Sequence, residues 1–241
     1  MGRITEAIKH LIIINIIFFV VPQLLKLDIA HYFALYFPKN DAFGFWQYLT
    51  HMFMHGSFMH IAFNMYALWA FGTPLEQMWG KKKFLFFYFS AGLGAGAIYT
   101  LVNYFQFNGV YEQLINMGVS ASDIRAILET GSYNNAVISL SNKEMSEFYS
   151  LYHTPAVGAS GAVYGILVAF GMMYPNAKLA LIFFPVPIAA KYFIPVMLLG
   201  DLFFGVTKYS VGNVAHFAHI GGAIIGFIIA WYWKKNQFKM Y

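Results

Sequence analysis

The sequence predicts an all-α membrane protein with six transmembrane helices and a polar outer insertion between the third and fourth helices. The chain of 241 residues is 59% hydrophobic and only 10% charged, whereas a soluble domain carries roughly 25% charged residues to cover its surface. Its long uncharged segments have the length of a bilayer-spanning helix. One polar stretch, residues 106–154, interrupts them. This composition excludes a soluble globule, and it excludes a disordered chain, which requires low hydrophobicity.

Six segments account for the predicted spans. A bilayer core about 30 Å thick requires roughly 20 mostly apolar residues per helix. The first segment is short, and the side chain of Lys26 is expected to reach outward from its end. The fifth segment carries Lys191 near its start and Asp201 inside it. The segments are residues 10–25, 42–75, 84–111, 148–177, 188–206 and 209–233.

The basic residues indicate how these spans are oriented. Six spans put both termini on one side of the membrane. With the termini inside, ten of the 15 lysines and arginines lie on inner segments, and basic residues concentrate on the cytoplasmic side. We therefore expect both termini in the cytoplasm and no nucleic-acid partner for the net charge of +5. The short N-terminus without a targeting segment predicts a multi-pass location in a bacterial cell membrane. The ten residues are Arg3, Lys9, Lys81, Lys82, Lys83, Lys178, Lys191, Lys234, Lys235 and Lys239.

Residues 106–154 carry helix signals of their own. Ser122 is predicted to cap a short helix that stops at Gly131, and Ser141 with Glu144 fits a capping box that opens a second helix. Loops longer than about 15 residues are uncommon unless they are functional or disordered. We therefore predict an extracytoplasmic insertion within a single membrane domain, residues 1–241.

Polar residues inside the predicted spans are candidate site residues, because burying them in lipid is costly. His60 and Asn64 lie in the second span, and a spacing of four residues stacks them on one helix face. The alternative is that this pair only joins helices through hydrogen bonds.

A second group opens the fourth helix, at Gly158-Ala159-Ser160-Gly161. A helix from Ser160 that ends before Pro175 has about 15 residues and a length near 22 Å, which is too short to cross the bilayer. Its N-terminus should therefore begin below the outer surface, inside the protein or beside a watery cavity. Tyr164 shares the face of Ser160. The small residues of this helix also suit plain close packing.

A third group, Ala218-His219-Ile220-Gly221-Gly222, opens the sixth helix. Gly222 and Gly226 form a bare stripe beneath His219, which permits close approach of another small-faced helix. The matching stripe of Gly161, Gly165 and Ala169 on the fourth helix is the expected partner. This contact would bring Ser160 and His219 to a similar depth.

Together these residues supply the parts of an acyl-transfer site. Ser160 is the candidate nucleophile and His219 the base that accepts its proton. The Ser160 N–H, His60 and Asn64 are the candidate donors to a developing oxyanion. The usual orienting carboxylate is not expected, because an ionised Asp201 would be expensive inside the membrane. The sequence therefore predicts a Ser–His dyad with Tyr164 packed on the imidazole.

These three motifs resemble those of the rhomboid family of intramembrane serine proteases, and the resemblance covers most of the chain. It implies a six-helix rhomboid-like bundle that hydrolyses a peptide bond in or next to a transmembrane segment of a protein substrate in the bilayer, with no cofactor and no metal. It implies Ser160 and His219 as catalytic residues and an oxyanion hole of His60, Asn64 and Ser160. Supporting positions are Gly158, Gly161, Tyr164 and Gly222.

The resemblance also implies the surroundings of the site. Substrate would enter past the fifth helix, beneath an outer loop at residues 207–215, and a large first outer loop would span residues 28–45. Many members carry arginine after the tryptophan of that first loop, whereas Trp46 is followed here by Gln47. We expect the insertion to form a small outer cap near the substrate access route.

Two alternatives stay open. A membrane metalloenzyme could use histidine boxes, although no carboxylate is expected to join the histidines within the membrane. A catalytically inactive rhomboid-like protein could instead bind membrane proteins. We expect structural roles for the remaining polar groups. His51 and His55 would tie the first loop to the second helix through hydrogen bonds, and His216 would make a loop–helix contact. Glu76 would be a hydrogen-bond acceptor or an ion-pair partner. The box histidines are His51, His55, His60, His216 and His219.

Overall fold

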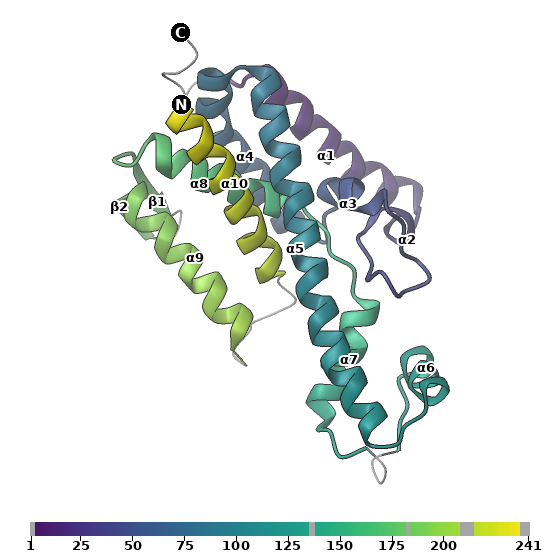
Figure 1. Cartoon of the computed structure of the whole chain (residues 1–241). Helices are drawn as coiled ribbons and strands as arrows, with labels where there is room; N and C mark the ends of the chain where they lie inside the picture. The colour runs from purple at the N-terminus through teal and green to yellow at the C-terminus, as the bar shows by residue number, and fades with distance from the viewer. Residues whose placement is uncertain (1–2, 135–137, 182–183, 208–214, 237–241) are drawn as a thin grey trace.

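A helix lies in each of the six segments predicted to span the membrane. The computed structural model describes residues 3–134, 138–181, 184–207 and 215–236. Among the described helices, α1, α5 and α10 are long and apolar enough to cross a membrane, so a helical multi-span membrane protein is confirmed and the count of six spans stays a prediction. The six helices are α1 (Glu6–Leu25), α4 (Phe58–Trp79), α5 (Lys81–Asn116), α8 (Ser160–Met173), α9 (Ala190–Val206) and α10 (His216–Asn236) (Figure 1).

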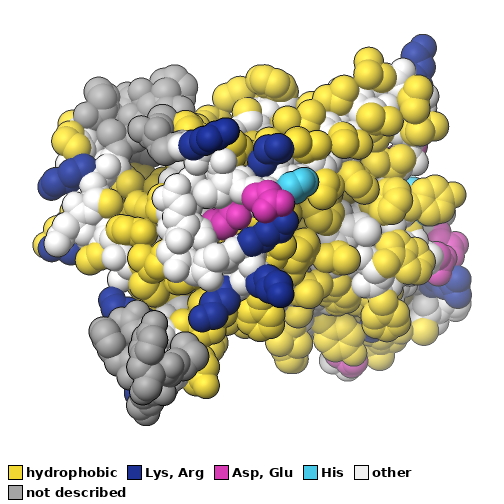
Figure 2. All heavy atoms as spheres, turned by 90° about the horizontal axis from the view of Figure 1, so that it is seen from above, with side chains coloured by type: hydrophobic (Ala, Val, Ile, Leu, Met, Phe, Trp, Pro, Cys, Tyr) yellow, Lys and Arg dark blue, Asp and Glu magenta, His cyan; other side chains and the backbone are white. Residues whose placement is uncertain are grey.

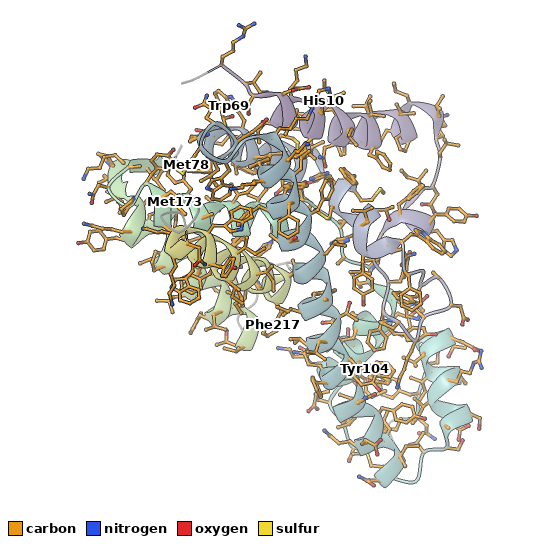
Figure 3. The ribbon with its side chains drawn as sticks, turned by 45° about the horizontal axis from the view of Figure 1, so that its top comes forward. His10, Trp69, Met78, Tyr104, Met173 and Phe217 are labelled. Carbon is orange, nitrogen blue, oxygen red and sulfur yellow. The ribbon has the colours of Figure 1, made fainter. Side chains whose placement is uncertain are left out.

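Helix α8 is the centre of the bundle. Most of its 14 residues are buried, and it contacts α4, α5, α9 and α10. Met173, at the end of α8, and Met78, near the end of α4, lie at one end of the bundle, whereas Phe217, at the start of α10, lies toward the other (Figure 3). Helices α8 and α10 therefore run in the same direction, and their first residues lie at the same depth.

The glycines of α8 and α10 allow the two backbones to touch, as predicted. A methyl group at Gly222 would collide with the carbonyl of Gly161, and one at Gly226 would lie 2.5 Å from Gly165 Cα. A methyl group at Gly165 would in turn lie 3.0 Å from the carbonyl oxygen of Gly222. Because interiors are packed to crystal-like density, this contact leaves no room for a side chain on either helix.

The N-terminus of α1 is tied to the end of α4 by one buried carboxylate. Glu76 accepts hydrogen bonds from Thr5 Oγ1 (2.5 Å), from the Ala7 N–H (2.8 Å) and from the Ile8 N–H (3.0 Å). It thereby satisfies backbone donors that a helix start leaves unpaired. The predicted structural role of Glu76 is confirmed.

Lysine and arginine side chains gather at the end of the molecule where α1 begins and α10 ends (Figure 1). Figure 2 looks onto this end and shows them around a small acidic group, with apolar side chains over much of the remaining view. Lys81 at the start of α5 pairs there with Glu6 at 2.8 Å. The many basic side chains at this end of the molecule support the proposal that it faces the cytoplasm.

The segment between α1 and α4, which contains the predicted first loop at residues 28–45, carries three short helical turns, α2 (Ala30–Phe33), α3 (Gln47–Thr50) and η1 (His51–Phe53). The helix of the second predicted segment therefore occupies only the later part of residues 42–75. Helix α4 begins only at Phe58, where the Ser57 side chain accepts a hydrogen bond from the His60 N–H at 3.2 Å.

The insertion is a small subdomain with a core of its own. Helix α5 continues without a break to Asn116, and α6 (Ala121–Thr130) and α7 (Asn142–His153) follow it. Phe148 is fully buried and stacks on Phe107 with ring centroids 4.6 Å apart, and Phe37 of the first loop joins the same cluster. The core therefore ties the insertion to the first loop.

Two predicted N-terminal helix caps lie in the insertion. The capping box of Ser141 and Glu144 is confirmed. The cap of α6 is Ser120 and not Ser122, because the Ser120 hydroxyl accepts the Asp123 N–H at 3.1 Å. Gly131 ends this helix in the left-handed conformation with φ 71°, which glycine adopts without steric cost.

An antiparallel hairpin, β1 (Lys178–Leu181) and β2 (Phe184–Ala189), joins α8 to α9 and was not predicted. Pro185 and Pro187 alternate within this stretch, and proline inside a helix removes a hydrogen bond and clashes with the preceding turn. Helix α9 therefore starts at Ala190, just after the predicted boundary.

We predict that Gly222→Ala destabilises the protein by about 1–3 kcal/mol, because overpacking forces the two helix backbones apart. Thermal unfolding of the purified protein in detergent measures the effect. The matched control is Gly200→Ala in α9, where an added methyl group meets no atom within 4 Å, and this change should leave stability the same or slightly raised. Equal stability of the two variants would contradict the packing described for α8 and α10.

Candidate active site

Ser160 is the first residue of α8 and follows an extended segment held against the first outer loop. Leu35 and Ala156 form an isolated bridge, and the Gly158 N–H donates to the His51 carbonyl at 2.9 Å. Gly158 has φ 125°, a conformation that side chains rarely allow. The N-terminus of α8 has no side-chain cap, so backbone N–H donors stay available beside the serine.

The structure brings Ser160 and His219 into hydrogen-bond contact. His219 Nε2 lies 2.9 Å from Ser160 Oγ. The ring of Tyr164, one turn further along α8, stacks on the imidazole with centroids 4.1 Å apart and an interplanar angle of 11°. The stacked ring limits rotation of His219, so the contact with Ser160 has a defined geometry.

His60 approaches the serine from α4, and Asn64 lies one turn further along the same helix. A carbon placed at the Cβ position of Gly158 would lie 2.8 Å from His60 Nε2 and 3.5 Å from Ser160 Oγ, so both groups border one small space. Asn64 is 5% exposed, and its Nδ2 has no hydrogen-bond partner among the described residues. A buried donor without a partner costs stability, and it can be retained for a group that arrives during function.

A carboxylate adjoins the histidine, contrary to the predicted carboxylate-free dyad. Asp201 Oδ1 lies 3.3 Å from His219 Nδ1 and 2.5 Å from His216 Nδ1. His216 thus contacts a side chain on α9, which was not predicted, and its expected loop–helix role stays a prediction. Two signals in the sequence pointed this way: Asp201 is the single acid in its predicted span, and spacing of three residues puts His216 and His219 on one helix face.

The same three residues form the metal-ligand candidate within the described part of the chain. Asp201, His216 and His219 each offer one ligand atom, and these atoms lie within 4.8 Å of one another. The expectation that no carboxylate joins the membrane histidines is thus wrong. The 2.5 Å contact between His216 and Asp201 is nevertheless that of a direct hydrogen bond, since two tetrahedral ligands at about 2.0–2.1 Å from zinc stand roughly 3.3 Å apart.

The remaining box histidines lie apart from this group. His51 Nδ1 contacts the Gln47 carbonyl at 2.8 Å. His55 packs edge-on to His60 with centroids 5.0 Å apart, and neither of its ring nitrogens has a hydrogen-bond partner among the described residues. The nearby backbone of Phe53 interacts with the His55 ring, and the expected tie from His55 to the first loop stays a prediction.

Gln47 holds the first loop at the position where arginine was expected from the resemblance. Its side chain is fully buried. Gln47 Oε1 accepts the Tyr36 N–H at 3.1 Å, and Nε2 donates to the Ala42 carbonyl at 2.7 Å. A neutral amide thus satisfies the loop backbone without a buried charge.

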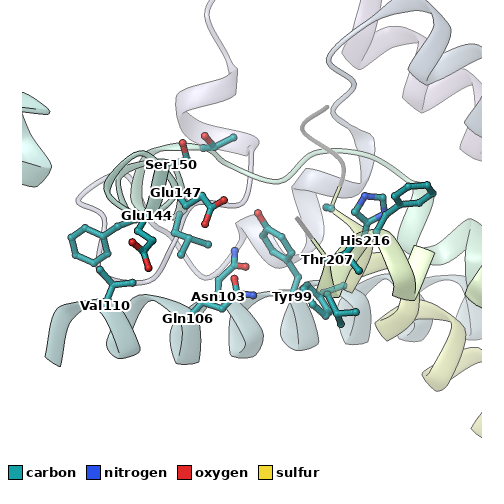
Figure 4. A pocket seen from close by; sticks show the side chains of 17 residues that line it. Tyr99, Asn103, Gln106, Val110, Glu144, Glu147, Ser150, Thr207 and His216 are labelled. Atoms are coloured by element: carbon teal, nitrogen blue, oxygen red, sulfur yellow. The ribbon is translucent and has the colours of Figure 1, made fainter. Parts of the chain in front are cut away.

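A cavity of about 540 Å³ lies between α5, α7 and the facing ends of α9 and α10. Figure 4 shows His216 at one end of it and Glu144 and Val110 at the other. The cavity therefore extends from the polar insertion to His216. Most of the outer loop expected at residues 207–215 lies outside the described residues.

Comparisons with known proteins match most of this chain to one family. The family model described as the rhomboid domain matches residues 42–123 and 124–236. Among curated relatives, Rhomboid protein 1, mitochondrial, of Saccharomyces cerevisiae is 28% identical over 76% of this chain and 40% of that protein. Presenilin-associated rhomboid-like protein, mitochondrial, of Rattus norvegicus is 30% identical over 78% of this chain and 40% of its own length.

A bacterial relative, Rhomboid protease GluP of Bacillus subtilis, is 29% identical over 77% of this chain and 25% of that protein. The chain thus spans two fifths or less of the length of these three relatives. The matched region contains Ser160, His219, His60 and Asn64.

Proposed function

The chain belongs to the rhomboid family, and from that premise we propose that it is an intramembrane serine endopeptidase. Its substrates are transmembrane proteins, cut in or next to the membrane-spanning segment. The observation that carries the proposal is the 2.9 Å contact between Ser160 Oγ and His219 Nε2 at the start of a short helix enclosed by four others. A hydroxyl and an imidazole in contact at such depth suit acyl transfer better than packing.

The proposed reaction has two steps. His219 Nε2 takes the proton of Ser160 Oγ while the oxygen attacks the scissile carbonyl carbon, and the proton then passes to the leaving amine as the C–N bond breaks. Water next attacks the acyl-enzyme with His219 as base. This step releases the carboxylic acid and returns the proton to Ser160.

The oxyanion of each tetrahedral intermediate needs donors that stand in place beforehand. We assign this role to the Ser160 N–H, to His60 and to Asn64. The support is the space that His60 Nε2 and Ser160 Oγ share around Gly158, together with the unpartnered Nδ2 of Asn64. A donor kept free in the resting protein gains its partner only when the charge develops.

The proposal includes the orientation of the protein in the membrane. We place both termini in the cytoplasm of a bacterial cell, where the basic end of the bundle faces anionic headgroups, and we place the insertion at residues 106–154 on the outer side. The wall that the insertion contributes to the cavity near His216 supports its role as a cap beside the substrate access route.

We predict that a fluorophosphonate probe labels the wild-type protein, and that Ser160→Ala removes the labelling completely. His219→Ala should abolish both labelling and cleavage of a transmembrane reporter, because the serine loses its base. Both variants should keep the thermal stability of the wild type within a few degrees. Labelling that persists in Ser160→Ala would refute the assignment, and an unlabelled wild type would favour an inactive membrane-protein binder.

We predict that His60→Ala and Asn64→Ala each lower kcat on the order of 100- to 1000-fold, as expected for loss of one oxyanion donor. The Michaelis constant should change little, because the ground-state carbonyl needs the donors less than the oxyanion does. Steady-state kinetics with a transmembrane reporter measures both values. Wild-type kcat in both variants would exclude these residues from the oxyanion hole.

We predict that replacing residues 106–154 by a short linker changes which substrates are cleaved, because it removes one wall of the cavity. Cleavage of a panel of reporters with different outer juxtamembrane segments tests this. Fluorophosphonate labelling of Ser160 serves as the control and should persist. Unchanged cleavage of every reporter would show that the insertion plays no part in substrate choice.

A further inference from the structure

Asp201 is the buried acid whose position the proposed dyad does not use. It lies within α9 in the apolar fifth segment and is 8% exposed. An ionisable side chain at such a depth is costly unless it is paired. Its partners therefore indicate what it does.

Two partners of Asp201 are imidazoles of α10, which contact the same oxygen, and a third is the Tyr164 side chain of α8, which donates a hydrogen bond to the carboxylate. Oδ1 lies 2.5 Å from His216 Nδ1 and 3.3 Å from His219 Nδ1. His219 uses its other ring nitrogen for Ser160 Oγ, at 2.9 Å. The carboxylate, the imidazole and the hydroxyl therefore form one continuous chain of hydrogen bonds across three helices.

This chain of hydrogen bonds determines which nitrogen of His219 carries the proton. A neutral imidazole has one N–H and one acceptor nitrogen. Among the described residues, the Asp201 carboxylate is the group that contacts Nδ1, and because it accepts, Nδ1 carries the hydrogen and Nε2 is left to accept from Ser160. When His219 takes the serine proton, the carboxylate is already in place to stabilise the imidazolium.

His216 accounts for how a carboxylate can remain at this depth. Its contact with Oδ1 is the shorter of the two, so it can share the charge of Asp201 as a second donor. His216 also lines the cavity that reaches the insertion, whereas Asp201 is not among its lining residues (Figure 4). The hydrogen bond from His216 thus holds the Asp201 carboxylate in place, and the same carboxylate keeps its contact with His219.

We propose that Asp201 is a positioning residue that orients His219 and sets its tautomer, so that the site works as a Ser160–His219–Asp201 triad supported by His216. This inference rests on the proposed function. Two other readings make different predictions: a tether that only joins α9 to α10, and a metal site of Asp201, His216 and His219.

The test compares two buried carboxylates of the same chain. In Asp201→Asn the amide can present its NH2 group to Nδ1, which moves the imidazole proton to Nε2 and blocks the acceptor for Ser160. We expect kcat and the rate of fluorophosphonate labelling to fall on the order of 100- to 10,000-fold, with the Michaelis constant within about twofold. The matched control, Glu76→Gln, makes the same chemical change far from Ser160 and should keep both rates within about twofold of wild type.

Each outcome bears on the proposal. If Asp201→Asn keeps more than half of the wild-type kcat, the triad is excluded, and lower thermal stability with full kcat identifies a tether. If a chelator abolishes wild-type labelling and added Zn²⁺ restores it, Asp201, His216 and His219 form a metal site and the triad is excluded. Absence of labelling in the wild type would instead refute the proposed function itself.

A measurement on the wild type covers the case in which Asp201→Asn does not fold. Nitrogen-15 NMR of histidine-labelled protein, with His219 assigned from a His219→Gln sample, reports which ring nitrogen is protonated. We expect hydrogen on Nδ1 and a bare Nε2. The opposite tautomer would overturn the proposal.

Discussion

The close contact of α8 and α10 is the constraint on which the rest of the site depends. Backbone touches backbone where Gly161 and Gly165 face Gly222 and Gly226, and this contact places the first turns of both helices at one depth. Ser160 and His219 stand in those first turns, so a hydroxyl and an imidazole meet without any loop to position them. Lipid provides no hydrophobic force between helices, and small residues that allow dense packing take its place.

The polar groups brought together by this contact form a connected set in an apolar bundle. Asp201, His216, His219 and Ser160 are joined by side-chain contacts of 2.5–3.3 Å, while the Nδ2 of Asn64 remains without a partner among the described residues. Polar groups that are hydrogen-bonded to one another are held in a fixed geometry. A donor without a partner can form its hydrogen bond during the reaction. In the proposed mechanism, Asp201 therefore orients the base, whereas Asn64 donates to the oxyanion.

The motifs of the sequence predicted much of this arrangement, because each depends on local spacing. Helix periodicity alone puts Tyr164 on the face of Ser160 and glycines beneath His219. The contact of Asp201 with His216 depends instead on how α9 is rotated against α10, which no spacing within one helix determines. The hairpin before α9 was missed although Pro185 and Pro187 signalled it, and the Ser120 cap was missed because two serines compete for one helix start.

The most direct test of the account is a crystal structure of the protein phosphonylated by a fluorophosphonate. We expect phosphorus on Ser160 Oγ, its phosphoryl oxygen directed at the Ser160 N–H, His60 and Asn64, and the imidazole of His219 still held against Asp201. A probe bound to another residue, or a phosphoryl oxygen turned away from all three donors, would contradict the account.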